Sequence, residues 1–367
     1  MEFLIHAQEI QGKKRKISLS EPVIHADNEK NGRSGHMGHA MALLKDGSII
    51  AFSSNTSKNR CSGHSAFGWM EYRYSKDQGK TFSEPIVFPY SKEEFYNGIN
   101  TVSVEKVITL DNGDLLAFCL LNSQFVEICC EPWECPKVVR STDGGKTWEK
   151  PINFSNYKGR VYDARVHDGA IYVLQHLNDA KEFFLGNKPE HEYRLFKSVD
   201  NGKTYTETVL PFESFGRGYG NMIFREDGAL IVYVYNGRDE QNMDYVISYD
   251  GGKTFSAPQQ SFVKNKIRNP QVGVLDGQFI LHGRAGESEG GKGSFVIYTS
   301  CDGIEWDEGT VLVKNLRPAC FYSSNLTVKL ADGKERMLVK YSENYHVGVV
   351  EGEWGQVNSM LMLIESV

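Results

Sequence analysis

Five segments of this chain repeat one short pattern, Ser-X-Asp-X-Gly-X-Thr followed by an aromatic residue, and the fifth copy is degenerate. Intervals of 66, 57, 50 and 52 residues separate the aspartates of these copies, which are Asp77, Asp143, Asp200, Asp250 and Asp302. Repeats of this length indicate one supersecondary unit used several times rather than separate domains. The Asp carboxylate can accept hydrogen bonds from the N–H groups of a tight turn, and the Gly can supply a positive φ. We therefore expect these aspartates to be structural.

A second pattern, an Asp-Gly or Asn-Gly turn followed by an apolar strand, occurs six times and interleaves with the first. These turns begin at Asp46, Asn112, Asp168, Asp227, Asp276 and Asp332. A copy of the first pattern follows each of the first five turns after 23 to 32 residues, which predicts a four-stranded meander per repeat. Six meanders predict an all-β fold, a six-bladed β-propeller in which residues 1–367 form a single domain. The β-prone residues 16–24 are expected to complete the last blade and close the ring.

Composition excludes several classes of partner. The net charge of −6 and the pI near 6.0 argue against nucleic acid, whose phosphates require a basic surface. No apolar run approaches the length of a membrane span, and the N-terminus lacks the pattern of a secretion signal. Seven cysteines are an odd number, which favours reduced thiols over a disulfide framework. We therefore expect a cytoplasmic protein without nucleic-acid, membrane or cofactor partners; the sequence does not indicate its oligomeric state.

In a propeller, the innermost strands run along a central channel, so residues at the same end of each strand meet at one opening. Counting back seven to ten residues from each turn reaches a set of polar and aromatic residues, namely His39, Arg160, Tyr219, Arg268 and Tyr322. Strand interiors would favour Val or Ile at such positions. These residues are therefore candidates for a binding or catalytic site.

The segment Phe321-Tyr322-Ser323-Ser324, eight residues before the Asp332-Gly333 turn, is similar to the nucleophile motif of sialidases. Together with the repeated pattern, which that family calls the Asp-box or BNR repeat, the chain resembles the sialidase (neuraminidase) superfamily from about residue 37 to residue 340. Members of the family hold the substrate carboxylate with three arginines. They attack with a tyrosine assisted by a glutamate, and they use an aspartate as acid/base catalyst. The resemblance implies that Tyr322 takes the place of the nucleophile and Arg238 that of the second arginine.

Other family positions are substituted here. The segment from Gly35 to His39 replaces the opening Arg-Ile-Pro, and the place of the acid/base aspartate falls on His64. The place of the assisting glutamate falls near Tyr219, and that of the third arginine near Lys292. The resemblance thus implies Tyr322, His64 and Tyr219 as catalytic residues, and Arg238, Lys292, His39 and Arg268 as substrate-binding residues.

Three functions fit these substitutions. In glycoside hydrolysis Tyr322 acts as nucleophile or acid/base, His64 as its partner, and Arg238 with Lys292 as a clamp for an acidic sugar. In β-elimination on a uronic acid the same cations neutralise the carboxylate while His or Tyr removes the adjacent proton. A non-catalytic glycan-binding propeller would use the aromatic rings alone. We expect an enzyme that cleaves an oligosaccharide or glycoside bearing an acidic sugar.

A metal site is a weaker alternative. His36, His39, Cys61 and His64 have spacings typical of metal ligands, and their segments flank the strands of the first blade at one end. Three histidines at a sugar-binding rim account for the pattern equally simply, so we expect no metal.

Overall fold

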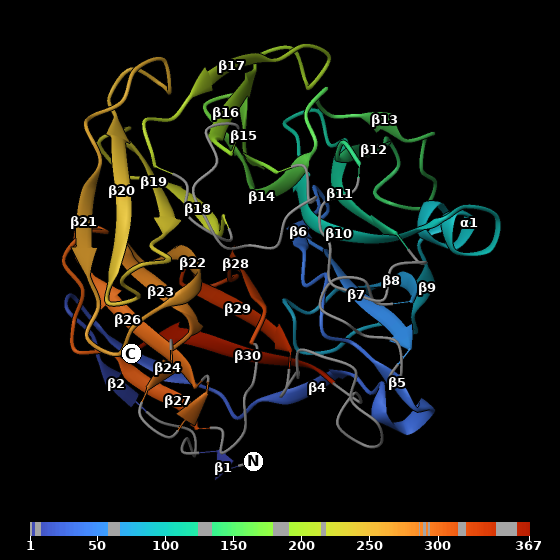
Figure 1. Cartoon of the computed structure of the whole chain (residues 1–367). Helices are drawn as coiled ribbons and strands as arrows, with labels where there is room; N and C mark the ends of the chain where they lie inside the picture. The colour runs from blue at the N-terminus through green and yellow to red at the C-terminus, as the bar shows by residue number, and fades with distance from the viewer. Residues whose placement is uncertain are drawn as a thin grey trace.

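The computed structural model of the chain describes residues 2–3, 9–57, 67–123, 134–178, 191–213, 218–285, 287–288, 291–292, 294–314, 321–342 and 358–367. Six antiparallel sheets are arranged around one axis (Figure 1). The prediction of an all-β, six-bladed β-propeller is confirmed. We call each sheet a blade and number the blades along the chain.

The first three blades follow the chain in order. Blade 1 contains β5 (Arg33–Ser34), β6 (Met41–Leu43), β7 (Ile49–Ser57), β8 (Gly68–Ser75) and β9 (Ile86–Val87). Blade 2 contains β10 (Asn100–Thr109), β11 (Leu115–Ser123), β12 (Lys137–Ser141) and β13 (Ile152–Asn153). Blade 3 contains β14 (Gly159–His167), β15 (Ala170–Leu177), β16 (Tyr193–Ser198) and β17 (Thr206–Val209).

The last three blades continue this arrangement. Blade 4 contains β18 (Gly220–Phe224), β19 (Leu230–Tyr235), β20 (Asn242–Ser248) and β21 (Gln259–Phe262). Blade 5 contains β22 (Arg268–Leu275), β23 (Gln278–Arg284), β26 (Phe295–Ser300), β27 (Thr310–Lys314) and β1 (Glu2–Phe3). Blade 6 contains β28 (Ser323–Lys329), β29 (Glu335–Ser342), β30 (Ser359–Ser366) and the N-terminal strands β2 (Glu9–Gln11), β3 (Lys16–Leu19) and β4 (Val23–Ala26).

Both ends of the chain contribute to blade 6. The antiparallel partner of Ile17 in β3 is Ser366 in β30, and that of Ala26 in β4 is Ser359. These pairs cover the outer edge of β30, which would otherwise expose unpaired backbone groups. The two strands are separated by Ser20, Glu21 and Pro22, and Pro22 lacks the N–H that a continuous strand would need there. The ring is therefore closed by hydrogen bonds between the beginning and the end of the chain. The assignment of residues 1–367 to one domain stays a prediction.

The Asp-boxes are hairpin turns held by their own side chains. In the second box, the Asp143 carboxylate accepts hydrogen bonds from Thr147 N (2.9 Å) and Thr147 Oγ1 (2.6 Å). Ser141 Oγ donates to Asp143 Oδ1 (2.9 Å) and accepts from Gly145 N (2.8 Å). These hydrogen bonds, those of Thr147 first, lower the pKa of Asp143 to about 2. The same contacts recur at Asp77, Asp200 and Asp250, which confirms that the box aspartates are structural.

The boxes also join neighbouring blades. Tyr72 of blade 1 donates its hydroxyl hydrogen to Gly145 O in the box of blade 2 (2.9 Å). The box residue Trp148 packs edge-on against Phe52 and Phe88, at ring-centroid distances of 6.0 and 5.1 Å. Blade 1 therefore buries the box aromatic residue of blade 2, which fixes the rotation between these two sheets.

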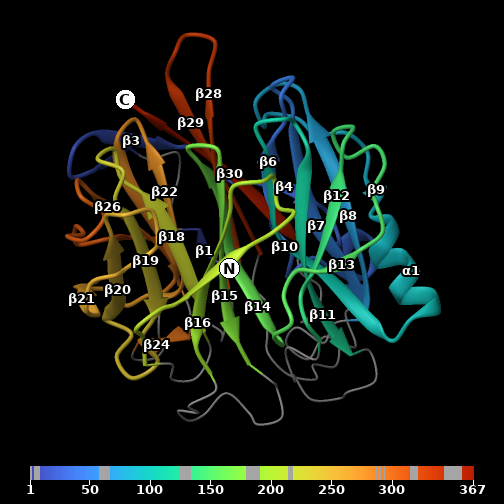
Figure 2. The same cartoon turned by 90° about the horizontal axis from the view of Figure 1, so that it is seen from above.

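The innermost strands β6, β10, β14, β18, β22 and β28 surround the axis and run in the same direction (Figures 1 and 2). Because the second strand of each blade is antiparallel to the first, its end lies beside the beginning of the first. Tyr235 N thus donates to Tyr219 O (2.7 Å), and Ser342 N to Tyr322 O (2.9 Å). We call the end of the ring where the innermost strands begin the mouth. The hairpin turns and Asp-boxes lie at the opposite, far end.

One α-helix, α1 (Pro89–Asn97), connects blades 1 and 2. Pro89 occupies its first turn, where a missing N–H has no cost. The hydroxyl of its buried Ser91 accepts a hydrogen bond from Met70 N (2.9 Å), and Phe95 packs on Trp69 with ring centroids 5.2 Å apart. The repeat pattern did not require this helix. No helix within the described ranges is long and apolar enough to cross a membrane.

Candidate functional site

Five blades contribute residues to one small cavity on the axis at the mouth. Its volume is about 40 Å³, room for one or two water molecules. The residues that line it are Met37, Gly38, His39, Glu105, Lys106, Arg160, Tyr162, Asn269, Gln271, Tyr322, Ser323 and Ser324. Residues far apart in the sequence therefore meet where the repeat pattern predicts a site.

Two predicted catalytic residues lie together at this mouth. The hydroxyl oxygens of Tyr219 and Tyr322 are 3.5 Å apart, and both side chains are buried. Tyr219 immediately precedes β18, and Tyr322 immediately precedes β28, so each side chain is placed by the start of an innermost strand. The ring of Tyr219 also packs edge-on against Tyr162 and Tyr235, at centroid distances of 5.8 and 5.6 Å. Packed rings on both sides fix the orientation of its hydroxyl.

An ion pair lies beside the two tyrosines. Arg160 Nε and Nη2 donate to Glu105 Oε2 at 2.8 and 2.5 Å, and both side chains are at least 90% buried. Burial by itself would lower the pKa of Arg160, but Glu105 overcomes this effect and raises it. The Arg160 guanidinium lies 5.0 Å from the centre of the Tyr162 ring and also interacts electrostatically with the hydroxyls of Tyr219 and Tyr322. The tyrosine pair is therefore next to a fixed charge.

Three of the cavity residues are placed by irregularities in strand pairing. The register of β10 shifts between Val104 and Lys106, which leaves Glu105 as an extra residue. Similar shifts make Tyr162 an extra residue in β14, and place Asn269 and Pro270 of β22 opposite the single residue Gly283 of β23. β-Bulges re-aim side chains and are common next to active sites. Glu105, Tyr162 and Asn269 all line the mouth cavity, so the bulges direct these side chains onto the axis.

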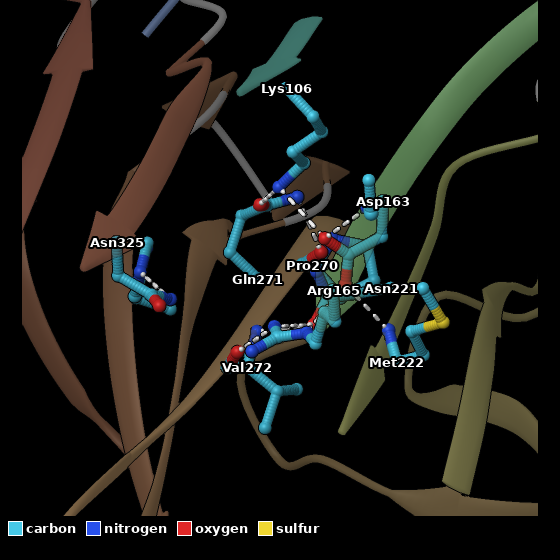
Figure 3. Close-up of polar contacts among 11 residues, drawn as sticks. Lys106, Asp163, Arg165, Asn221, Met222, Pro270, Gln271, Val272 and Asn325 are labelled. Carbon is cyan, nitrogen blue, oxygen red and sulfur yellow. Dashed lines mark hydrogen bonds and ion pairs between the residues drawn. The ribbon is translucent and has the colours of Figure 1, made fainter. Parts of the chain in front are cut away.

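A layer of polar side chains below the mouth cavity joins blades 2, 3, 4 and 5 (Figure 3). Lys106 Nζ donates to Gln271 Oε1 (2.9 Å) and lies 3.3 Å from Asp163 Oδ1. The other oxygen of Asp163 accepts from Arg165 Nε (3.0 Å) and Met222 N (3.0 Å). Burial would raise the pKa of Asp163, but Arg165 and Lys106 hold it below its usual value. We call this group the axial network.

A second cavity lies on the other side of the axial network. Its volume is about 300 Å³, and it shares Lys106, Gln271 and Ser324 with the mouth cavity. It extends along the innermost strands toward the far end, past Thr109 and Val166. The network thus separates two hollow parts of one channel.

His39 forms the wall of the mouth cavity on blade 1. Its side chain is buried, its Nδ1 is 3.5 Å from Ser359 Oγ, and its Nε2 has no hydrogen-bond partner among the described residues. Burial and then the nearby Lys340 hold the pKa of His39 well below its usual value, so the ring is neutral. Behind it, His25 is also buried and neutral for the same two reasons.

The two predicted substrate-binding arginines, Arg268 and Arg238, lie in different surroundings. Arg268 lies near the tyrosines: its guanidinium is 5.5 Å from the centre of the Tyr235 ring, and its side chain is 28% exposed. Its Nε lies 3.8 Å from Glu240 Oε1. Arg238 follows β19 and so lies at the same end of the ring, but its side chain is 58% exposed and pairs with Glu213 at 3.1 Å. Tyr235 packs against Tyr219, so one aromatic ring lies between Arg268 and the tyrosine pair.

Three predicted residues have no described side chain. His64 and Cys61 lie outside the described residues, and only the backbone of Lys292 is described, in the short hairpin of β24 (Glu287–Ser288) and β25 (Gly291–Lys292). The proposed metal ligands His36 and His39 are both buried. Within the described ranges no three His, Cys, Asp or Glu side chains are grouped as a metal site.

Three residues of the mouth cavity, Glu105, Tyr162 and Asn269, are not among the site residues predicted from the sequence. Glu105 lies seven residues before Asn112, which is within the interval that identified the other inner-strand candidates. That count could therefore have found it. Tyr162 and Asn269 lie one or two residues beyond the candidates of their own blades, and only the bulges bring them to the cavity.

Comparison with known proteins agrees with this architecture. The BNR/Asp-box repeat family matches residues 139–150, which form the box of blade 2. A curated sialidase of Bacteroides fragilis (strain YCH46) is 27% identical over an alignment 235 residues long that covers 54% of this chain and 42% of that protein. The match thus spans less than half of the length of that relative.

Three solved structures share the fold. A protein of unknown function from Dyadobacter fermentans DSM 18053 superimposes with a TM-score of 0.70 at 17% identity, over 96% of this chain and 99% of that one. Hadza microbial sialidase Hz136 gives 0.65 at 14% identity, over 93% and 68%. The α-L-arabinofuranosidase arb93a from Fusarium graminearum gives 0.56 at 13% identity, over 95% and 98%.

The fold and the repeats define a class, the Asp-box β-propellers with a glycoside hydrolase-like fold. Within that class the chain is a sialidase-like propeller with BNR repeats.

Proposed function

We propose that the protein is an enzyme that cleaves a glycosidic bond of an acidic sugar at the mouth of the propeller. The observation that carries this proposal is the pair of buried hydroxyls of Tyr219 and Tyr322, 3.5 Å apart and next to the Arg160–Glu105 ion pair. Two tyrosine hydroxyls within reach of each other can pass a proton between them, which an isolated tyrosine cannot do. The sialidase and arabinofuranosidase neighbours support glycosidic bonds as the target class.

In the proposed hydrolysis the Tyr322 oxygen forms a bond to the anomeric carbon while the bond from that carbon to the leaving oxygen breaks. Tyr322 gives its hydroxyl proton to Tyr219 while Tyr219 releases its own proton to water at the mouth, and protonated His64 gives a proton to the leaving oxygen. A water molecule then attacks the anomeric carbon and gives one proton to His64. The bond to the Tyr322 oxygen breaks, and Tyr322 regains a proton from Tyr219, which is reprotonated by water. Arg268 begins β22 and Arg238 follows β19, both at the mouth, and Lys292 ends β25 of the β24–β25 hairpin; we propose these three residues as the cations that attract the sugar carboxylate.

Sialosides and uronic-acid oligosaccharides are the substrates to screen, with absorbance near 235 nm followed in parallel. Release of sugar without an increase in this absorbance supports hydrolysis. An increase in the absorbance would reassign Tyr322 and His64 to proton transfer in β-elimination. Tyr322→Phe is expected to lower turnover by about 100-fold or more, since positioned proton transfer is worth about 10²- to 10⁴-fold. Tyr245→Phe is the matched control, because its hydroxyl contacts Gln259 on the outer strands of blade 4.

Unchanged turnover in Tyr322→Phe and Tyr219→Phe would reject the catalytic assignment. Saturable binding of these sugars without any cleavage would instead identify a glycan-binding propeller.

A further inference from the structure

We infer that the mouth cavity is a recognition site for one uncharged hydroxyl-bearing substituent of the sugar, held between Glu105 and His39. This inference rests on the proposed function and specifies how the sugar is oriented. It starts from two buried polar atoms, one on blade 2 and one on blade 1, that have no hydrogen-bond partner among the described residues and belong to residues lining the same cavity.

The first atom is Glu105 Oε1. The other oxygen of this carboxylate accepts both hydrogen bonds from Arg160, and the side chain is only 10% exposed. The β10 bulge fixes the backbone of Glu105, and the ion pair fixes its carboxylate. A buried carboxylate oxygen without a donor is costly, because water can no longer solvate it. A ligand that brings a hydrogen-bond donor to this position therefore gains a strong, charge-assisted bond.

The second atom is His39 Nε2. The ring is neutral, so it carries one N–H and one lone pair. In the tautomer that this orientation requires, Nδ1 accepts the hydroxyl hydrogen of Ser359 (3.5 Å), so Nε2 carries the ring proton and is the donor. An acceptor oxygen and a donor nitrogen then belong to residues on two walls of the same cavity. A hydroxyl group can satisfy both, since it donates one hydrogen and accepts another.

Size and charge restrict the group further. At about 40 Å³ the cavity admits a hydroxyl or a hydroxymethyl group but not a sugar ring, so the ring must lie above it. The sugar carboxylate does not fit there, because it would meet the negative charge of Glu105. The Arg160 nitrogens nearest to this wall already donate to Glu105. We therefore place the sugar carboxylate on the side of blades 4 and 5, toward Arg268, and the hydroxyl-bearing substituent toward blades 1 and 2.

Calorimetric titration with two sugar acids, N-acetylneuraminic acid and glucuronic acid, tests this orientation. Each acid is compared with analogues from which one hydroxyl at a time has been removed. Loss of the recognised hydroxyl is expected to weaken binding to the unmodified protein about 10- to 100-fold, as for a hydrogen bond to a charged group. In the Glu105→Gln and His39→Gln variants, removal of the same hydroxyl should weaken binding by less than a third of that factor, because the substitution has already impaired the contact.

The control variant is Glu207→Gln. Glu207 pairs with Arg194 at 2.9 Å on the outside of blade 3, so this change removes a similar carboxylate away from the mouth. In Glu207→Gln, loss of the recognised hydroxyl is expected to weaken binding as much as in the unmodified protein. His39→Gln preserves the Glu105–Arg160 ion pair, so the test stands if Glu105→Gln does not fold.

The inference would be overturned if removal of each hydroxyl weakened binding equally in the unmodified protein and in all three variants. It would also be overturned if neither acid bound. Coupling between one hydroxyl and Glu105 without turnover of any glycoside would overturn the proposed function but not this orientation. Turnover without such coupling would overturn only the orientation.

Discussion

His282 is expected to make the stability of the propeller depend on pH. Its side chain is fully buried, and its Nε2 accepts a hydrogen bond from Asn325 Nδ2 (2.9 Å), which leaves the ring proton on Nδ1 facing Ser323 Oγ (3.1 Å). Burial and then the positive charge of Lys106 lower the pKa of His282 to about 3. Protonation would add charge where no acceptor is placed to receive it. The folded protein therefore keeps this ring neutral in weak acid.

The sign and size of the effect follow from linkage. A histidine in the unfolded chain has a pKa of about 6.5, so between about pH 6.5 and pH 3 the unfolded state binds one more proton than the folded state. Stability is therefore lost as the pH falls, by about 1.4 kcal/mol per pH unit, or about 2 kcal/mol for this residue between pH 7 and pH 5. His176 has a pKa lowered to about 3 by burial and by His191, and it contributes a similar loss.

Equilibrium urea unfolding followed by tryptophan fluorescence, at half-unit steps from pH 8 to pH 4.5, measures this loss. His282→Gln can keep hydrogen bonds to Ser323 and Asn325 without titrating. Its stability should fall between pH 7 and pH 5 by about 2 kcal/mol less than that of the unmodified protein. Comparison at pH 8 corrects for changes in packing. If the free energy of unfolding changed with pH in the same way for both proteins, the fold would not be holding His282 neutral.

Three other changes test the framework and the site. Tyr219→Phe keeps the packed ring but removes the contact with Tyr322, and we expect at least a 100-fold loss of turnover with an unchanged melting temperature. Ser141→Ala removes the hydrogen bonds of the box serine with Asp143 and Gly145, and urea unfolding should show a loss of about 1–3 kcal/mol without an effect on sugar binding. Gly79→Ala makes a methyl group overlap with a Leu338 methyl at φ +86°, so the buried Leu338 side chain or the box turn must shift. The expected loss of stability is about 1–3 kcal/mol, and a loss below 0.5 kcal/mol would contradict this contact.

The blade count and the tyrosine pair follow from the sequence because both depend on periodic features. The turns and Asp-boxes recur once per blade, and each fixes its geometry with its own side chains, as Ser141 and Asp143 show. Tyr219 and Tyr322 precede the first strands of their blades at similar distances from the following turns. A count along the sequence therefore places both at the same end of the channel.

The rest of the site depends on strand bulges and on contacts between blades, which the spacing of residues from the turns does not indicate. A bulge changes which face of a strand a side chain occupies, so the bulge in β10 determines that Glu105 lines the cavity. The ion pair of Lys106 with Asp163 joins two blades and depends on the rotation between them. Motif similarity pointed to Arg238, but it carried no information on Glu213, which pairs with that arginine near the surface.

The pairing of β3 with β30 also bears on how the chain folds. Ile17 and its partner Ser366 are 349 residues apart, so the sixth sheet cannot assemble until the last strand of the chain has been synthesised. Closing so large a loop is entropically costly and slow, whereas blades 2, 3 and 4 each form from consecutive strands. We expect ring closure to be the late step of folding. A circular permutant that joins the original termini and opens the chain between blades 3 and 4 should move that late step to a different seam.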